Sequence, residues 1–366
     1  MRVAVIGGGA CGVICALKLK KNNPDIEVVI FEQNDRILKK VLKSGNGKCN
    51  ISNSLITEDM YNDFSLIGNN SDIDVNKELK ELGIVLKETT LGRVYPYSES
   101  SKTVVNVLLR NLDKYNIVIK TNYNVSKIEY QNNLFTINNQ EYFDYVVIAT
   151  GSIAQEKTLG YDLVKSLGHR ILQLQPGLVP IITEEKTDHL QGIRCKCETK
   201  FNGRTIKGEL LFKNDGLSGI LSLDLSCLVK IGDKISFDLM PEFTHQEIKD
   251  LFKDKSVSSR DVLEGIFNKV LVNDLIKRSK NLNEIIENIK NYQFTVKGFK
   301  DFKEAQIVRG GVCLDEVNND FSSRKLNKLY LGGEILDVNG LSGGYNLYFA
   351  WLSGIVIANS ICNKMF

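Results

Sequence analysis

A glycine cluster between an apolar segment and a helical one constrains the N-terminal fold of this chain. Residues 3–6 form a short apolar run, and residues 11–21 have helical character. Between and within them, Gly7, Gly9 and Gly12 match the pattern G-x-G-x-x-G. In a dinucleotide-binding unit these glycines permit a tight turn, a close backbone approach to a pyrophosphate, and close packing of helix on strand. The segment therefore predicts a strand, a tight turn and a helix.

A second apolar run completes this unit. Residues 26–31 are apolar, and Glu32 follows them 20 positions after Gly12. A carboxylate at this place accepts hydrogen bonds from ribose hydroxyls, and the helix N-terminus offers N–H groups to phosphates. We therefore expect a βαβ unit that binds an adenine dinucleotide.

Two later segments favour FAD over NAD as that dinucleotide. The chain carries only one glycine fingerprint, whereas enzymes with two dinucleotide domains carry two. Residues 142–151 predict a strand that ends in Ala-Thr-Gly, and residues 329–334 predict one that ends in Gly-Gly-Glu. The run NGLSGGYN then leads into a C-terminal helix. This second glycine loop is a suitable support for the polar edge of a flavin ring.

The net charge and the cysteines indicate which partners and which cellular compartment to expect. The net charge of +3 is too small to indicate a nucleic-acid partner. The eight cysteines follow no disulfide framework, so we interpret them as free thiols in the cytoplasm. Residues 346–362 approach the length of a membrane span, but polar residues interrupt them, and we expect a buried helix rather than a membrane segment.

The middle of the chain changes pattern at about residue 176. Short segments with strand character follow one another up to residue 243, and the Asn-Gly pair within residues 201–204 predicts a hairpin turn. Residues 244–290 carry apolar side chains at helical spacing. We therefore expect an insert with a β part and a helical part.

Eight segments, taken together, resemble one family of bacterial flavoproteins. The strongest is KKVLKSGNGKCNISN, which resembles a K-x-x-x-S-G-x-G-R-C-N-x-T/S-N signature. The chain is thereby similar, over nearly its whole length, to the HI0933-like family of NAD(P)/FAD-dependent oxidoreductases, which includes BaiN-like and aminoacetone-oxidase-like proteins. The matching segments are 39–53, 92–109, 149–152, 166–169, 175–181, 209–220, 310–317 and 332–354.

The resemblance implies an α/β fold with a discontinuous FAD-binding domain. This is a glutathione-reductase-type, Rossmann-like domain interrupted by a small β-barrel and a helical subdomain. The boundaries that we expect are 1–175 and 296–366 for the FAD-binding domain, 176–243 for the barrel-like insert and 244–295 for the helical subdomain.

The residues assigned to FAD combine the glycine unit with the positions that match the family. One departure is Lys48, which stands where the family usually has an arginine, and lysine cannot make bidentate contacts. Another is Val312 with Cys313, where a threonine is common. The set comprises Gly7, Gly9, Ala10, Cys11, Gly12, Glu32, Gln33, Lys40, Ser44, Gly45, Gly47, Lys48, Cys49, Asn50, Val125, Thr150, Gly151, Gly333, Glu334, Gly343, Gly344, Tyr345 and Asn346.

The residues that assist the chemistry are less well marked. A flavin carries the redox step itself, so no protein nucleophile is required. Arg93 is a candidate to hold an anionic or carbonyl group, and Tyr95 and Tyr97 are candidates to line the flavin pocket, although a packed turn around Pro96 explains all three equally well. The histidines are scattered, no cluster has metal-ligand spacing, and Cys49 has a structural role in preference to a reactive one.

Two classes of function remain open from the sequence. The first is an enzyme that acts on a small organic molecule. It either reduces an activated C=C bond with NAD(P)H as a transient donor or oxidises an amine or aminoketone with oxygen. The second is a flavin-binding redox or partner module without enzymatic activity. Substrate identity and oligomeric state do not follow from these residues.

Overall fold

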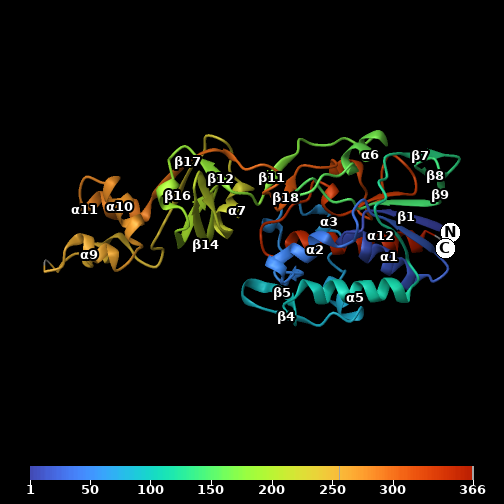
Figure 1. Cartoon of the computed structure of the whole chain (residues 1–366), viewed down its shortest axis with the longest axis horizontal. Coiled ribbons are helices and arrows are strands. Elements are labelled where there is room, and N and C mark those ends of the chain that lie inside the picture. The colour runs from blue at the N-terminus through green and yellow to red at the C-terminus, as the bar shows by residue number, and fades with distance from the viewer. Residues whose placement is uncertain (255, 365–366) are drawn as a thin grey trace. The chain divides into compact units, whose positions relative to one another are not determined.

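The structure is a computed structural model that describes residues 1–254 and 256–364. The chain divides into two compact units, coloured along the sequence in Figure 1. The first unit comprises Met1–Gln175 and Ile307–Phe366, and the second comprises Pro176–Gln306. Each unit has its own cluster of buried apolar side chains.

A five-stranded parallel sheet organises the first unit. Its strand order is β19-β10-β1-β2-β6, and every neighbouring pair runs parallel. The chain moves from β1 to β2 on one side and returns to β10 on the other, so the order reverses beside β1. In such sheets ligands bind at the carboxyl ends of the strands next to this reversal. The strands are β1 Arg2–Ile6, β2 Glu27–Phe31, β6 Val118–Lys120, β10 Tyr145–Ile148 and β19 Leu329–Leu331.

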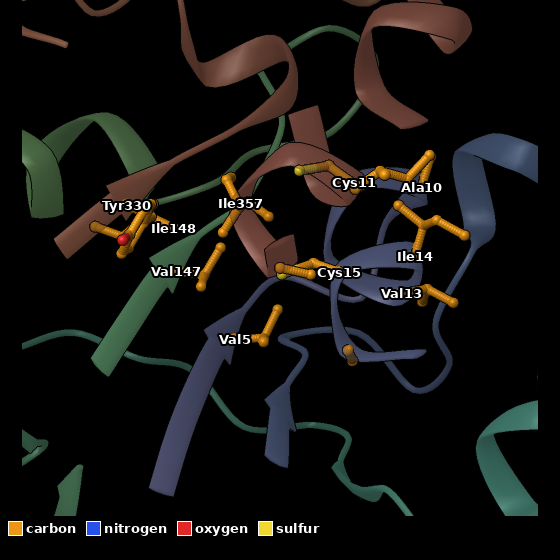
Figure 2. Packing of buried hydrophobic residues seen from close by; sticks show 14 of the residues in the cluster. Val5, Ala10, Cys11, Val13, Ile14, Cys15, Val147, Ile148, Tyr330 and Ile357 are labelled. Atoms are coloured by element: carbon orange, nitrogen blue, oxygen red, sulfur yellow. The ribbon is translucent and has the colours of Figure 1, made fainter. Parts of the chain in front are cut away.

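Helices of the first unit pack against this sheet and against one another. The fully buried run from Val3 to Ile6 is typical of a parallel strand covered on both faces. Figure 2 shows side chains of α1, α12 and the sheet packed in one apolar cluster, among them Cys15, Ile357 and Val147. The helices are α1 Ala10–Asn22, α2 Lys39–Lys43, α3 Ser65–Gly68, α4 Val75–Glu81, α5 Ser101–Lys114, α6 Gly160–Ser166 and α12 Tyr345–Asn363.

Helices α1 and α12 approach each other closely at a glycine. A Cβ atom added at Gly354 would lie 2.4 Å from the carbonyl oxygen of Cys11 and 2.4 Å from Cγ2 of Ile14. By length and composition alone α12 is apolar enough to cross a membrane, yet 72% of its apolar window is buried inside the protein. The helix is therefore a core element of this unit, as the interrupted apolar run predicted.

Two small antiparallel sheets complete the first unit. The antiparallel sheet β3-β5-β4 begins with the last two residues of the KKVLKSGNGKCNISN motif, and β7-β8-β9 is a meander. The boundaries of the first unit fall within β11 and immediately before β18. The bounds are β3 Ser52–Asn53, β4 Leu86–Glu88, β5 Arg93–Pro96, β7 Ile128–Gln131, β8 Leu134–Ile137, β9 Glu141–Phe143, β11 Gln175–Gly177 and β18 Ile307–Arg309.

The second unit is built on a six-stranded antiparallel sheet that curls toward closure. The strand order is β13-β14-β15-β12-β17-β16, and a bridge between Glu198 and Asp238 joins β13 to the chain at the end of β16. This near-closed sheet agrees with the expected small β-barrel. The strands are β12 Ile181–Thr183, β13 Arg194–Phe201, β14 Arg204–Lys213, β15 Gly216–Ser218, β16 Lys234–Phe237 and β17 Tyr292–Phe299.

The hairpin and the helical part of this unit lie where the sequence predicts them. Phe201 pairs with Arg204, and Asn202 and Gly203 both have positive φ, as a two-residue hairpin turn requires. The helices are α7 Ile220–Ser226, α8 His245–Asp250, α9 Ser259–Glu264, α10 Lys269–Lys277 and α11 Leu282–Lys290.

The structure places the return to the first unit later than the sequence boundary at residue 296. That boundary falls inside β17, which pairs with β12 and β16 and buries Tyr292, Phe294 and Val296 in the second apolar cluster. The barrel therefore includes a strand that follows the helices, and the second unit extends to Gln306. Strand alternation alone could not reveal which sheet accepts β17.

Candidate flavin site at the carboxyl edge of the parallel sheet

The turn after β1 is made of glycines that have different physical tasks. Gly7 has a φ of +111°, and a Cβ there would lie 2.4 Å from the carbonyl oxygen of Ala149 at the end of β10. A Cβ at Gly12 would lie 2.0 Å from the carbonyl oxygen of Gly7. A Cβ at Gly9 would meet no atom within 4 Å. Gly7 and Gly12 allow close packing of the backbone, whereas the space beside Gly9 lets a ligand approach the backbone.

Helix α1 begins immediately beyond this open side. Gly9 is its N-cap residue, and Ala10 and Cys11 form the first positions of the helix. Its first turn contains no acidic side chain, and Lys20 and Lys21 lie in its last turn. The first amide groups of a helix have no carbonyl acceptor within the helix and carry a partial positive charge. The turn and the helix end thus form an anion-binding cradle.

Glu32 is held beside this cradle at the carboxyl end of β2. Its carboxylate accepts a hydrogen bond from the Gly8 amide at 2.9 Å and one from the Asn34 amide at 2.8 Å. Its exposed fraction is only 8%. The Tyr123 amide donates to the Glu32 carbonyl at 2.9 Å, which brings the segment that contains the buried Val125 to the same edge. Each carboxylate oxygen has further lone pairs that can accept from ribose hydroxyls.

The ends of β10 and β19 bring a lysine and a glutamate together. The Lys40 ammonium lies 3.5 Å from the Glu334 carboxylate and donates to the Ser152 carbonyl at 3.1 Å. A Cβ at Gly151 would lie 3.9 Å from the same ammonium. The Val308 amide donates to the second carboxylate oxygen of Glu334 at 3.1 Å. Residues from four distant segments therefore meet at one edge.

A glycine loop precedes α12 on the same unit. Gly343 and Gly344 have φ values of +139° and +99°, and a Cβ at Gly344 would lie 2.3 Å from the Ser52 carbonyl oxygen. Asn346 accepts from the Gly340 amide at 2.8 Å and donates to its carbonyl at 2.7 Å. Asn346 thus holds the loop itself, and Tyr345 is buried with its ring 5.8 Å from that of Tyr61.

Asn53 was not singled out by the sequence, although it lies in the KKVLKSGNGKCNISN motif. Its buried amide donates to the Gly343 carbonyl at 2.9 Å and to the Leu91 carbonyl at 3.2 Å. The side chain therefore joins the loop before α12 to the turn before β5. Its position at the end of the motif was the one signal that pointed to it.

The segment that follows α2 folds into a tight 3₁₀ turn with unusual backbone angles. Gly45 and Gly47 have positive φ, and Cys49 also has positive φ although it is not glycine. Ser44 donates its hydroxyl to the Val41 carbonyl at 2.7 Å. A Cβ at Gly45 would lie 2.8 Å from the backbone nitrogen of Asn50. Glycine is therefore required to close this turn around Asn50.

Lys48 points away from the buried residues of this turn. Its ammonium lies 2.9 Å from the Glu99 carboxylate, and both side chains are exposed. Binding of FAD through Lys48 would require this pair to open. Gln33 is likewise engaged elsewhere, because its amide donates to the Lys157 carbonyl at 2.7 Å.

The two cysteines of the predicted set are buried and poorly acidic. Burial raises the pKa of Cys11 to about 12 and that of Cys49 to about 11. The Cys11 thiol lies 3.4 Å from the Ser353 hydroxyl, which also accepts from the Gly333 amide at 2.9 Å. These thiols pack the site and are not nucleophiles at neutral pH.

Two buried oxygen atoms test whether this edge fits a cofactor. Within the described part of the chain, Asn50 Oδ1 and Thr150 Oγ1 have no hydrogen-bond partner. Leaving a buried polar group unpaired costs about 1–3 kcal/mol, and these two oxygens belong to the residues assigned to FAD. The open side of Gly9 and the Glu32 carboxylate complete a set of polar groups that fits a dinucleotide with hydroxyl and amide groups.

Arg93 and Tyr95 lie on β5, and Tyr97 directly follows the strand. Arg93 and Tyr95 are half-buried, while Val94 and Pro96 alternate with them and are buried. Tyr97 is exposed, and the Lys87 ammonium lies 5.8 Å from the centre of its ring. The structure thus separates Tyr97 from the two half-buried candidates.

The other titratable groups of the described residues do not form a metal-binding cluster. His169 is buried, its pKa is lowered chiefly by burial, and its Nε2 lies 2.9 Å from the Ser323 hydroxyl. Cys195 and Cys197 share one face of β13, and all eight cysteines are free thiols. Within residues 1–254 and 256–364, no group of three or more histidine, cysteine or acidic side chains has metal-binding geometry.

A Rossmann-type parallel sheet with this cradle has the architecture of a dinucleotide-binding domain. The chain belongs to the HI0933-like family, since the model described as "HI0933-like protein Rossmann domain" matches residues 1–360. The expected family, the FAD-binding fold class with its inserted barrel, and the enzyme class are thereby confirmed.

Two curated relatives match almost the whole chain. The 3-dehydro-bile acid delta(4,6)-reductase of Clostridium scindens is 28% identical, and the match covers 99% of each chain. The ribosomal RNA dihydrouridine synthase of Haemophilus influenzae is 27% identical, and the match covers 98% of each. Among solved structures, the 3-ketosteroid delta1-dehydrogenase of Sterolibacterium denitrificans shares the fold with a TM-score of 0.51 and 10% identity, over 99% of each chain.

Proposed function

We propose that this enzyme reduces a carbon–carbon double bond conjugated to a carbonyl group in a small organic molecule. The observation that carries the proposal is chemical agreement between the two curated relatives. The name of the first denotes reduction of double bonds in a 3-oxo compound. Dihydrouridine, in the name of the second, is uridine whose C5=C6 bond, conjugated to the C4 carbonyl, has been saturated. Both names therefore describe the same kind of reaction, the saturation of a C=C bond conjugated to a carbonyl group.

The residues of the sheet edge would hold FAD in this enzyme. The Gly7–Gly12 turn and the N-terminus of α1 suit the pyrophosphate, and the Glu32 carboxylate suits the ribose hydroxyls. Lys40, Glu334, Asn50 and Thr150 would bind other polar groups of the cofactor. FAD in its reduced form supplies a hydride equivalent, and the buried, apolar setting of this unit favours exclusion of water from the reaction.

We propose NAD(P)H as the electron donor and the cytoplasm as the compartment. The sequence contains a single dinucleotide fingerprint, so the donor would bind transiently over the flavin rather than in a domain of its own. The eight free thiols suit a reducing compartment.

A uracil base in ribosomal RNA is a second candidate substrate. The Haemophilus influenzae relative favours it, whereas the small net charge of +3 favours a small molecule. The chemistry at the double bond is the same for a small conjugated ketone and for a uracil base. One experiment that offers each substrate in turn therefore distinguishes the two candidates.

The test is anaerobic and follows the flavin absorbance of the purified protein. NADH or NADPH should bleach the flavin, and a 3-oxo-Δ4 steroid should restore its colour and gain two hydrogen atoms, as measured by mass spectrometry. Recovery with a uridine-containing ribosomal RNA fragment alone would assign the second candidate. Bleaching by a small amine but not by NAD(P)H, with peroxide formed on admitting oxygen, would replace the reductase with an oxidase.

A further inference from the structure

Arg93 carries a charge that the protein itself does not balance. Within residues 1–254 and 256–364, its guanidinium group has no hydrogen-bond or ion-pair partner, and its backbone carbonyl alone accepts from Thr89. The side chain is half-buried in the middle of the β3-β5-β4 sheet. A partly desolvated cation without an internal partner is costly unless a ligand supplies the acceptor.

Three other cations near this sheet and the candidate site are already paired. Lys48 and Lys87 both bind the Glu99 carboxylate, whose pKa these two ammonium groups lower to about 2. Lys40 pairs with Glu334. Arg93 is therefore the cation among these four that remains available to a ligand.

The register of the small sheet directs Arg93 toward the glycine loop before α12. Arg93 lies directly opposite Asn53 in the antiparallel pair of β5 and β3. Opposed residues project from the same face of a sheet, and the Asn53 amide on this face binds the Gly343 carbonyl. The neighbouring residue Val94 projects from the other face into the apolar core.

The backbone before Arg93 is fixed. Leu91 and Gly92 have φ values of +60° and +68°. A Cβ at Gly92 would lie 2.5 Å from the Asn53 amide oxygen, so the turn is packed onto the same asparagine. Asn53 thus holds the loop of Gly343 and the start of β5 in one arrangement, and Arg93 projects from a preorganised position.

We propose that Arg93 binds the carbonyl oxygen of the substrate and stabilises the negative charge that develops there. This inference rests on the proposed reductase function and assigns the residue that polarises the conjugated system. Guanidinium donors aimed at a developing oxyanion strengthen in the transition state, and loss of one such donor typically lowers kcat about 10²–10³-fold.

The role follows from the balance of bonds in the reduction. The carbon–carbon π bond breaks, and a C–H bond forms at the β carbon with the hydride equivalent that reduced FAD provides. The displaced electron pair moves onto the carbonyl oxygen, where Arg93 donates hydrogen bonds to the enolate. A proton from water then forms the C–H bond at the α carbon, and the carbonyl is restored. The substrate gains two electrons and two protons, and NAD(P)H supplies the electrons.

The first test uses 4-nitrophenol, which resembles an enolate when ionised and reports its ionisation by its own absorbance. FAD-loaded wild-type protein should bind the phenolate and lower the apparent pKa of the bound probe. Arg93→Gln should lose that shift, and Arg93→Met, which keeps the apolar stem, should lose it as well. Arg110→Gln is the matched control, because Arg110 is an exposed, unpaired arginine on α5 within the described residues. A shift that survives in Arg93→Gln, or that wild-type protein never shows, would overturn the proposal.

The second test separates the two half-reactions. Bleaching by NAD(P)H and the bound FAD content should match wild type in Arg93→Gln, while flavin recovery by a 3-oxo-Δ4 steroid should slow about 10²–10³-fold. Arg93→Lys should recover part of the rate. Loss of FAD from Arg93→Gln, or an unchanged recovery rate, would overturn the role of Arg93. If no conjugated ketone restores the colour of wild-type protein, the reductase function itself fails, and the phenol titration still decides the anion-binding role.

Discussion

At the scale of single residues, the site depends on positions where a side chain is excluded or its charge is fixed. Gly7 and Gly12 leave no room for a Cβ, whereas Gly9 leaves its side open. The Glu32 carboxylate is fixed by backbone amides on both oxygens. The different roles of the three glycines follow from the local strand–turn–helix pattern, so the sequence predicts them, whereas the two amides that hold Glu32 become visible only in the fold.

The thiol of Cys49 should behave as a buried, inert group. Because burial raises its pKa to about 11, the reactive thiolate is scarce at pH 8 and increases only as the pH approaches 11. We expect iodoacetamide to label the more exposed Cys195 or Cys313 first in folded protein at pH 8, with Cys49 labelled only after unfolding. Peptide mass spectrometry over time measures this. Rapid labelling of Cys49 at pH 8 in the folded protein would indicate an activated thiol instead.

Partners that are distant in the sequence limit what the pattern can predict for single residues. Lys48 stands where the family motif usually has an arginine, but its ion-pair partner Glu99 lies 51 residues away in the sequence. Asn346 matches the motif too, yet its amide closes the loop that begins at Gly340. The sequence motif places a polar residue at both positions, but it does not reveal that Lys48 contacts Glu99 or that Asn346 contacts Gly340.

At the scale of elements, the periodic segments were predicted correctly, and the pairing of one strand was not. The βαβ unit, the strands at 142–151 and 329–334 and the Asn-Gly hairpin all form at the expected places. Strand β17 belongs to the barrel, although it follows the helical part of the insert. An alternating strand shows its buried face in sequence, but its neighbours depend on the whole unit.

The contact between α1 and α12 should be intolerant of any larger side chain at Gly354. Gly354→Val would place methyl groups against the Cys11 carbonyl and Ile14, and overpacking of this kind costs about 1–3 kcal/mol. Chemical denaturation should show that loss, together with weaker FAD retention, because α1 carries the anion-binding cradle at its N-terminus. Asn363→Val at the end of α12 is a control, and equal stability of the two variants would show that the helices do not pack as described.

At the scale of the whole molecule, two separate apolar clusters predict two cooperative units. The first cluster includes the parallel sheet with α1 and α12, and the second includes the barrel with its helices. All residues assigned to FAD lie in the first unit. Binding energy should therefore stabilise the first unit directly.

Scanning calorimetry with and without added FAD tests this division. We expect two transitions, of which one moves to higher temperature with FAD at 100 times its dissociation constant, equivalent to about 2.7 kcal/mol. The other transition should stay within error of its position without FAD. A Pro176–Gln306 fragment provides the control for assigning that second transition. A single transition that shifts as a whole would contradict two independently cooperative units.

The central claim is that the carboxyl edge of the parallel sheet binds FAD, and the most direct measurement is the flavin absorbance of purified Glu32→Lys beside wild type and Glu27→Lys. Glu27 lies at the exposed start of the same strand, so its replacement controls for the change of charge. Wild type and Glu27→Lys should retain about one FAD per chain, because both keep the Glu32 carboxylate. Glu32→Lys should fold and remain colourless, whereas a full flavin spectrum in that variant would contradict the site described above.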